Sequence, residues 1–469
     1  MTEKKITRRQ ALKYACVGAA GAVGAYYGLT RSGLIAFLDD DAKKTDFPQV
    51  TKRKNYVNGD IIPLLSFGCM RLPIKGRDRS NIDEELASKM LDYAYRRGIN
   101  YFDTAYRYHN GMSEVFMGKY LKKYPREDFF IATKMPGQLV QNSEDPKRIF
   151  QEQLDRLQTN YIDYYFLHSL SHGDDPMAHF KHVYEKLGTF EYLKREKEAG
   201  RIRQLGFSFH GPMPLMEYLL NNYKWDFCMI QLNYFDWDLD EGGISGGKEK
   251  DIILKKRFYP SAKYYKMLDN KKIPAFVMEP LRGGQLAVLN PDAVKILKEN
   301  DPSQTPVSWA LRYAGAFPNV LSLVSGMSTM KHVIENVDIM TDFKPLEEKD
   351  YPVLNKALIA FKEKLGILCT QCMYCMPCPY GVNITEIFRV YNQCAGTIGV
   401  PIDPLGENYS AQKKTFLVSY NNAVRKNEQA AHCTGCNKCV DICPQKLEIP
   451  ALMEQIEGMV NLAKGKTKK

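Results

Sequence analysis

Residues 162–168 read Ile-Asp-Tyr-Tyr-Phe-Leu-His, a short and mostly apolar run that ends in a polar side chain. Its β-branched and aromatic residues favour a strand, and strands that are apolar on both faces are typical of a buried parallel sheet. Helical patterns follow most of the runs of this kind. The candidate strands are Leu64–Gly68, Ile99–Asp103, Phe129–Thr133, Ile162–Leu167, Ile202–Phe207, Cys228–Leu232, Ala275–Met278 and Val320–Val324.

Eight β/α units in sequence predict an α/β fold, and a closed (β/α)8 TIM barrel over residues 56–345 fits them best. A doubly wound open sheet is the alternative. It would be expected to carry a glycine-rich dinucleotide fingerprint, which this sequence lacks.

Eight of the twelve cysteines form two runs near the C-terminus. The runs are Cys369-x2-Cys372-x2-Cys375-x2-Cys378-Pro379 and Cys433-x2-Cys436-x2-Cys439-x3-Cys443-Pro444. The second run has the spacing of two-cluster ferredoxins, in which the fourth cysteine ligates the neighbouring cluster. The first run has one residue fewer before its last cysteine. Structural zinc and disulfides are alternatives, but zinc usually takes pairs of cysteines rather than runs of four. We therefore expect two 4Fe-4S clusters, ligated by all eight cysteines.

The sequence changes character after Pro345. Segments such as Tyr351–Leu365 and Ala411–Lys426 have helical patterns, and strand-like runs are missing. We therefore expect a mainly α-helical two-cluster ferredoxin-like domain after the barrel. The predicted order is a signal peptide at 1–38, a spacer at 39–55, the barrel at 56–345, the ferredoxin-like domain at 346–462 and a basic tail at 463–469.

The N-terminus resembles an export signal. A charged head precedes the apolar stretch Ala15–Gly28, and Thr7–Lys13 resembles a twin-arginine motif with Ala11 where phenylalanine is usual. An ordinary secretory signal or an uncleaved anchor is the alternative. Because iron–sulfur clusters are assembled inside the cell, a cluster protein should cross the membrane folded, as the twin-arginine pathway allows. The prediction is a periplasmic or cell-envelope protein that contacts the membrane only through this segment, if it is uncleaved.

The net charge of +11 is diffuse apart from the chain ends. Basic residues form no stripe interleaved with aromatic residues, which argues against a nucleic-acid partner.

Four polar residues stand where barrel strands end. Asp103 and Tyr108 follow the second strand, Lys134 ends the third and His168 ends the fourth. Catalytic groups of TIM barrels lie at these carboxyl ends. We therefore expect the four side chains to meet in one site.

These residues, in this order, resemble those of the aldo/keto reductase family. The resemblance covers residues 60–340, including Leu205–Ser208, Gln231–Asn233, Glu279–Leu281 and Glu335-Asn336. The cysteine domain and the export signal are similar to a bacterial subgroup with a ferredoxin-like tail. The resemblance implies reduction of a small-molecule carbonyl, with Tyr108 as the proton donor.

The remaining catalytic roles are also implied by the resemblance. Lys134 would lower the pKa of the Tyr108 phenol, Asp103 would hold Lys134, and His168 would orient the substrate oxygen.

The nicotinamide contacts carry over less completely. Ser208 and Gln231 match residues that bind the nicotinamide amide, and Asn233 follows Gln231 in the same stretch. Lys331 and His332 could bind a 2′-phosphate, although their loop could instead be a plain helix start. Phe209-His210 stands where asparagine is usual, and Met278-Glu279 replaces the aromatic residue that stacks on the nicotinamide ring. The cofactor implied is NADP or NAD.

A hydride carries two electrons, whereas a cubane cluster accepts one at a time, so three functions stay open. The first is an NAD(P)H-dependent carbonyl reductase. The second is a ferredoxin-linked oxidoreductase whose clusters exchange electrons with a barrel-bound substrate or a partner protein. The third is a non-catalytic electron carrier or binding protein. Cys69, Cys228 and Cys394 lie apart from the runs and are expected in the core.

Overall fold

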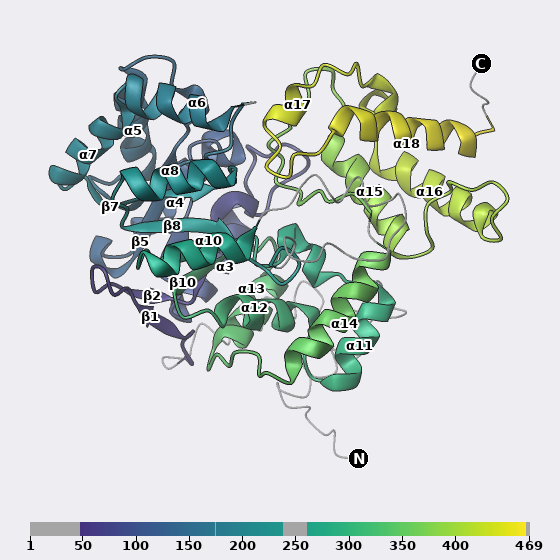
Figure 1. Ribbon diagram of the computed structural model, residues 1–469, viewed down its shortest axis with the longest axis horizontal. Helices are drawn as coiled ribbons and strands as arrows, with labels where there is room; N and C mark the ends of the chain where they lie inside the picture. Colours follow the sequence, from purple (N-terminus) through teal and green to yellow (C-terminus); the bar gives the residue numbers. More distant parts are fainter. Residues whose placement is uncertain (1–46, 174, 238–259, 365, 466–469) are drawn as a thin grey trace.

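The computed structural model describes residues 47–173, 175–237, 260–364 and 366–465 (Figure 1). The predicted signal peptide and residues 39–46 of the predicted spacer lie outside the described residues. No helix among the described residues is long and apolar enough to cross a membrane.

Eight parallel strands close into a barrel in the order β10-β3-β4-β5-β6-β7-β8-β9, which confirms the predicted (β/α)8 fold. The open doubly wound sheet is therefore wrong. The barrel strands are β3 (Leu65–Gly68), β4 (Tyr101–Asp103), β5 (Phe130–Met135), β6 (Ile162–Leu167), β7 (Ile202–Phe209), β8 (Phe227–Gln231), β9 (Ala275–Met278) and β10 (Val320–Ser325).

A short hairpin precedes the barrel. Strand β1 (Lys52–Lys54) pairs antiparallel with β2 (Ile61–Pro63), and the Arg53 guanidinium donates to the carbonyl of Phe317 at 2.8 Å. The predicted spacer at 39–55 therefore ends earlier than expected, because its last residues form part of the folded unit.

Helices connect the strands and form the outer layer. They are α3 (Glu84–Arg96), α4 (Met112–Leu121), α5 (Asp145–Leu157), α6 (Pro176–Phe180), α7 (Thr189–Glu198), α8 (Met213–Asn222), α10 (Ser261–Asn270), α11 (Pro291–Asn300), α12 (Pro306–Gly315) and α13 (Met330–Met340). Helix α3 illustrates the sequence logic, since Asp83 caps its first turn and its apolar residues face the strands.

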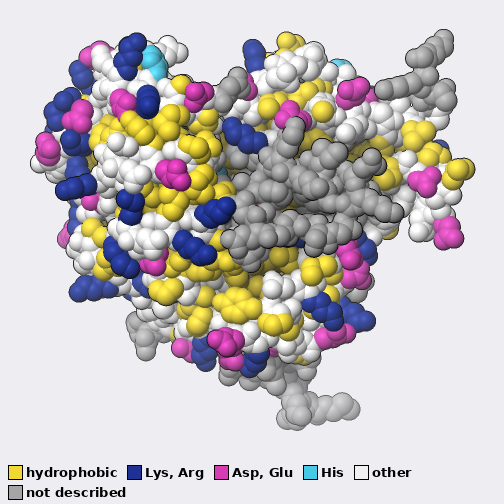
Figure 2. Space-filling model, in the orientation of Figure 1, with side chains coloured by type: hydrophobic (Ala, Val, Ile, Leu, Met, Phe, Trp, Pro, Cys, Tyr) yellow, Lys and Arg dark blue, Asp and Glu magenta, His cyan; other side chains and the backbone are white. Residues whose placement is uncertain are grey.

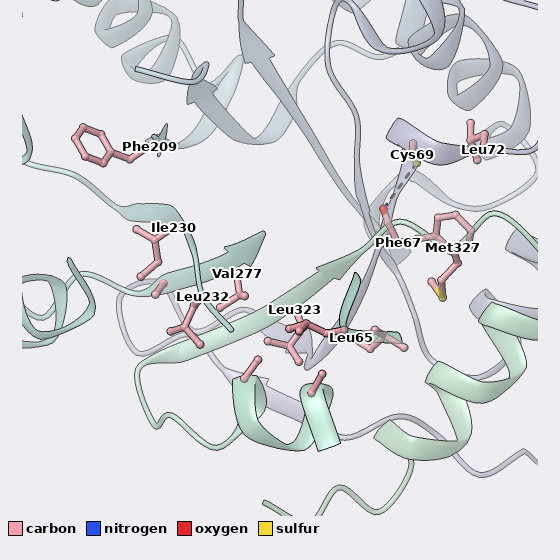
Figure 3. Packing of buried hydrophobic residues seen from close by; sticks show 14 of the residues in the cluster. Leu65, Phe67, Cys69, Leu72, Phe209, Ile230, Leu232, Val277, Leu323 and Met327 are labelled. Atoms are coloured by element: carbon pink, nitrogen blue, oxygen red, sulfur yellow. Dashed lines mark hydrogen bonds between the residues drawn. The ribbon is translucent and has the colours of Figure 1, made fainter. Parts of the chain in front are cut away.

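Two apolar layers hold the barrel together. Its interior is filled largely by aromatic rings of Tyr101, Tyr164, Phe166, Phe227 and Phe276, which contact one another edge-on or stacked. The second layer lies between strands and helices. Figure 3 shows part of it, with Leu65 of β3 beside its register partner Leu323 of β10. The barrel is thus a packed core, and only its ends are open to chemistry.

The C-terminal part is helical, as predicted. Its helices are α14 (Asp350–Glu363), α15 (Ile384–Gly396), α16 (Tyr409–Ala423), α17 (Lys438–Asp441) and α18 (Ile449–Ala463), and no strand occurs among its described residues. Figure 1 shows α15 to α18, in green to yellow, gathered at one side of the barrel.

The loops that carry the cysteines dock on the carboxyl ends of the strands. The Arg71 guanidinium donates to the Thr370 carbonyl at 2.7 Å, and Lys446 Nζ donates to the Ser171 carbonyl at 3.1 Å. Gly283 has φ +64°, and a Cβ there would lie 2.0 Å from the Thr370 oxygen. The position therefore requires glycine for the two parts to approach this closely.

Positive charge is spread over the surface. On the face shown in Figure 2, Lys and Arg side chains lie among Asp and Glu side chains on the barrel side without forming a continuous stripe. The picture agrees with the diffuse net charge of the sequence.

Candidate active site

The four strand-end residues do meet at the mouth of the barrel. Lys134 Nζ lies 2.7 Å from Asp103 Oδ1 and donates a second bond, also of 2.7 Å, to the Thr104 carbonyl. Both side chains of this ion pair are almost fully buried, with exposed fractions of 2% and 4%. The same ammonium lies 5.0 Å from the centre of the Tyr108 ring. The phenol and the ammonium are therefore on the same side of the mouth, as the sequence predicted.

His168 completes the group. Its ring centre lies 6.2 Å from that of Tyr108, and the two rings meet edge-on. Tyr108 reaches this place because it begins a 3-10 turn, Tyr108–Gly111, directly after β4. His168 follows β6 and is buried. Both side chains closely follow strand ends, β4 and β6 with β5 between them, rather than lying in long loops, which gives them fixed positions.

An aromatic residue from the C-terminal part lies between these two side chains. The Tyr374 hydroxyl is 3.1 Å from His168 Nε2 and is also hydrogen-bonded to the Tyr108 hydroxyl. Tyr374 stands between Cys372 and Cys375 in the first cysteine run. The sequence analysis missed it, because nothing in the spacing of the run indicates that it reaches the barrel.

Burial dominates the electrostatics of the site. It raises the pKa of Tyr108 well above its ordinary value, with smaller contributions from Tyr374 and Asp103. The net shift is therefore upward, opposite to the lowering expected from Lys134, because burial is the largest influence on this pKa. Burial also lowers the pKa of His168 well below its ordinary value, assisted by Lys134, so the imidazole is neutral and able to exchange hydrogen bonds.

The predicted nicotinamide residues lie around the same mouth, but most of their polar atoms are engaged. Ser208 Oγ accepts from the Ser169 N–H at 2.7 Å. Asn233 Nδ2 donates to Asp236 at 2.9 Å and to the Glu279 carbonyl at 3.0 Å, so it shapes the turn after β8. Gln231 donates to the same Asp236 at 2.5 Å.

Gln231 has another partner. Its Oε1 accepts a hydrogen bond of 3.3 Å from the side-chain amide of Gln445, which lies two residues after Cys443. Sequence reasoning gave no signal for this contact either. Met278 ends β9, and Glu279 follows it with a left-handed backbone, φ 56°. These two residues stand where the family resemblance would place an aromatic residue that stacks on the nicotinamide ring.

Lys331 and His332 lie in the first turn of α13, whose cap is Thr329. The Thr329 hydroxyl accepts from the His332 N–H at 3.3 Å, and His332 Nδ1 accepts from the Ser328 N–H. Both side chains are exposed. The N-terminus of a helix with a basic side chain is suited to bind a phosphate group, which is compatible with the role predicted for Lys331 and His332 in cofactor binding.

The cysteines of the two runs lie close together. One cavity is lined by Cys369, Cys372 and Cys375 of the first run and by Cys443 of the second. Cys439 of the second run interacts electrostatically with Cys433 and Cys436 of the same run and with Cys378 of the first. Each group thus takes three thiols from one run and one from the other, which is the pairing expected of two-cluster ferredoxins.

Backbone amides point at some of these sulfurs. The Gln371 N–H donates to Cys369 Sγ, and the Leu447 N–H donates to Cys443 Sγ, both at 3.4 Å. All eleven cysteines among the described residues are free thiols. No three His, Cys, Asp or Glu side chains in the described part of the chain are placed to hold a metal ion. The sulfurs of Cys369, Cys372, Cys375 and Cys443 line a cavity.

The three isolated cysteines of the described chain are core residues, as predicted. Cys69, Cys228 and Cys394 are buried. Burial raises the pKa of the Cys69 and Cys228 thiols, and Cys69 Sγ donates to the Phe67 carbonyl, drawn as the dashed line in Figure 3.

Buried histidines at the mouth make stability depend on pH. Burial lowers the pKa of His109, His172 and His210 to about 4, below the ordinary value of about 6.5. Between these values the unfolded chain binds more protons, so stability falls as pH decreases. His109→Gln should therefore weaken this acid destabilisation, by up to about 1.4 kcal/mol per pH unit. Urea unfolding midpoints at pH 7 and 5 measure the difference. An equal loss of stability in both proteins would contradict the expectation.

Comparison with known proteins agrees with the site. The aldo/keto reductase family model matches residues 64–359, which end before the first cysteine run. The uncharacterized oxidoreductase YqkF of Bacillus subtilis is 28% identical over 318 residues, covering 64% of this chain and 94% of that protein. L-galactose dehydrogenase of Arabidopsis thaliana is 26% identical over 286 residues, 56% of this chain and 81% of that protein.

A solved structure is also similar. The holo form of the aldo-keto reductase AKR11C1 from Bacillus halodurans superimposes with a TM-score of 0.50 and 26% identity, over 66% of this chain and 96% of that one. With the barrel, the strand-end residues and the family match in agreement, this chain belongs to the aldo/keto reductase family and is an oxidoreductase.

Proposed function

We propose that the chain reduces the carbonyl group of a small molecule with hydride from NADPH or NADH. One observation carries this proposal. The Tyr108 hydroxyl and His168 Nε2 both bond to a single oxygen atom, that of Tyr374. Two polar groups that converge on one oxygen can equally hold and polarise a carbonyl oxygen.

The residues then divide the chemistry as follows. A bound nicotinamide supplies the hydride that adds to the carbonyl carbon. As the carbon–oxygen π bond breaks, the oxygen takes the proton of the Tyr108 hydroxyl, and the product is an alcohol. His168 orients the oxygen by hydrogen bonding. The Lys134 ammonium, fixed by Asp103, lies near the phenol and stabilises the phenolate that remains until Tyr108 is reprotonated.

The mouth also offers contacts for a nicotinamide nucleotide. Gln231 already binds a carboxamide, that of Gln445, which has the same donors and acceptor as the nicotinamide amide. Ser208 and Asn233 lie beside it, and Lys331 and His332 at the start of α13 would contact the phosphate groups. The chemistry of these residues therefore fits NADP or NAD.

The two cysteine groups are proposed to hold one 4Fe-4S cluster each. Cys369, Cys372, Cys375 and Cys443 would ligate the cluster beside the barrel mouth, because they line one cavity. Cys378, Cys433, Cys436 and Cys439 would ligate the other. The donor set fits, since thiols are the usual cluster ligands and amide N–H groups point at Cys369 and Cys443.

A second function is favoured by the position of the two cysteine groups, one near the surface and the other beside the barrel. Cys436 is exposed, whereas Cys369 and Cys443 are buried near the barrel. Two clusters would therefore form a path from the surface to the tetrad of Asp103, Tyr108, Lys134 and His168, through the loop that carries Tyr374. Such a path suits a ferredoxin-linked oxidoreductase that exchanges electrons with a partner protein docked near Cys436. A non-catalytic electron carrier would need the same path, but not the arrangement of Tyr108 and His168.

Export through the twin-arginine pathway to the periplasm or cell envelope remains part of the proposal. Its support is the Thr7–Lys13 motif and the need to carry assembled clusters across the membrane in a folded protein. Loss of the exported pool after Arg8→Lys and Arg9→Lys together would be the direct check, read by cell fractionation.

Removal of the Tyr108 hydroxyl should abolish carbonyl reduction. With 4-nitrobenzaldehyde and NADPH, Tyr108→Phe is expected to lower kcat/KM about 10²- to 10⁴-fold, because the proton donor is lost. The matched control is Tyr106→Phe, since the Tyr106 hydroxyl bonds to Glu152 at 2.5 Å instead of to the tetrad. NADPH oxidation at 340 nm measures both, and a fully active Tyr108→Phe enzyme would refute the assigned acid.

Iron content tests the crossed ligand assignment. Anaerobically purified protein should contain about eight iron atoms per chain, in two 4Fe-4S clusters. Cys443→Ala should disturb the cluster formed by the first run, although it changes a residue of the second. Cys394→Ala is the control, because Cys394 is buried apart from both groups. Iron analysis and electron paramagnetic resonance of the reduced protein provide the readout, and full cluster content in Cys443→Ala would contradict the assignment.

The relay can be separated from nicotinamide chemistry. Protein with dithionite-reduced clusters, freed of excess reductant, should reoxidise on addition of 4-nitrobenzaldehyde without nicotinamide if the clusters deliver electrons to the barrel. Absorbance near 400 nm follows the clusters. An unchanged spectrum over hours would leave the hydride route and exclude the relay for this substrate.

A further inference from the structure

Tyr374 connects the cysteine loop and the catalytic residues through its two ends. Its backbone N–H donates to the Cys372 sulfur, and its hydroxyl bonds to His168 and Tyr108. The ring centres of Tyr374 and His168 are 6.1 Å apart and meet edge-on. The Tyr374 oxygen thus lies within reach of Tyr108 and His168, the two residues proposed to bind the carbonyl oxygen.

Gln445 makes a parallel contact at the nicotinamide side of the mouth. Its amide bonds to Gln231, the residue expected to bind the nicotinamide carboxamide. The neighbouring Lys446 fixes the same loop to the barrel through the Ser171 carbonyl. Gln445 and Tyr374 come from different cysteine runs, so two separate loops reach two separate parts of the site.

We propose that Tyr374 and Gln445 are further residues of the active site, which compete with the substrate oxygen and the nicotinamide carboxamide for Tyr108, His168 and Gln231. This inference rests on the proposed function, since it uses the roles assigned there. The C-terminal domain closes the barrel by presenting the same chemical groups as the reactants, a hydroxyl oxygen and a carboxamide. Reactants enter only when the two loops withdraw.

The competition follows from geometry. A hydrogen bond holds its two heavy atoms about 3 Å apart, so a carbonyl oxygen within reach of both Tyr108 and His168 would overlap the Tyr374 oxygen. The Tyr374 contact is not needed to dock the cysteine loop on the barrel, because other hydrogen bonds already hold this loop. The Arg71–Thr370 bond and the Gln285 bond to the Cys369 carbonyl, at 3.2 Å, lie outside the tetrad.

Two variants separate the competing groups. Tyr374→Phe keeps the ring but removes the oxygen, and Gln445→Ala removes the amide. Tyr380→Phe is the matched control, because Tyr380 lies in the same loop region but is 49% exposed. Binding is measured at equilibrium, with 4-nitrobenzaldehyde by calorimetry and with NADPH by its fluorescence. Iron content confirms that each variant retains its clusters.

We expect Tyr374→Phe to bind 4-nitrobenzaldehyde about tenfold more tightly than the unaltered protein, which corresponds to about 1.4 kcal/mol. Gln445→Ala should tighten NADPH binding in the same direction, and Tyr380→Phe should change neither affinity. Unchanged or weaker aldehyde binding by Tyr374→Phe would overturn the competition, and weaker binding would make Tyr374 a substrate-binding group instead.

Hydrogen–deuterium exchange of the unaltered protein gives a test that needs no variant. Saturating 4-nitrobenzaldehyde should speed exchange at residues 370–376, because the loop withdraws, and no change there would refute withdrawal. Neither readout requires turnover. If Tyr374→Phe binds the aldehyde more tightly but no NADPH is oxidised, the carbonyl reductase proposal is refuted and the competition stands. If NADPH is oxidised but the affinity of Tyr374→Phe is unchanged, the competition is refuted and the reductase proposal stands.

Discussion

A buried ammonium at the mouth of the barrel is the constraint on which the site depends. Burying a charge without a partner is costly, and removing one member of a buried pair typically destabilises a protein by about 3–5 kcal/mol. Lys134 is compensated by Asp103 and by the Thr104 carbonyl, which fixes its position between β4 and β5. The pair thereby sets where the phenol of Tyr108 must lie to sense the charge. The pKa of this phenol is not lowered automatically, because burial raises it.

Among the described residues, the cysteine loops contact the candidate active site at this mouth. The interior behind it is filled by the rings of residues such as Tyr164 and Phe276, so no path leads through the barrel. Docking at the mouth needs a close backbone approach, which Gly283 permits against Thr370. A side chain at position 283 would push the loop away and with it Tyr374.

The sequence was sufficient for the barrel and its strand-end residues. Buried parallel strands are nearly continuous apolar runs, so 162–167 and 275–278 coincide with β6 and β9 at both ends. Their order then brought Asp103, Lys134 and His168 to one edge, because parallel strands end on the same side. The local sequence pattern was sufficient to predict those features that depend on residues adjacent in the chain.

The contacts between the two parts were beyond the reach of such patterns. Tyr374 is more than 200 residues from His168 in the sequence, and its neighbours in the run indicate only a cysteine loop. Lys52–Lys54 was assigned to the end of a polar spacer, yet these residues pair with β2. In each case the decisive partner is distant in sequence and weakly specified by composition.

The strength of the Tyr374 contact determines what kind of closure it provides. A net hydrogen bond contributes about 0.5–1.5 kcal/mol, so two of them favour the closed loop by roughly 1–3 kcal/mol. A ligand that binds only the open form then loses about 5- to 150-fold in apparent affinity. Such a preference for the closed loop weakens the binding of carbonyl compounds but still allows the site to open. The same loop carries Cys372, whose sulfur the Tyr374 N–H contacts, so the closing hydroxyl and a cysteine thiol belong to one segment.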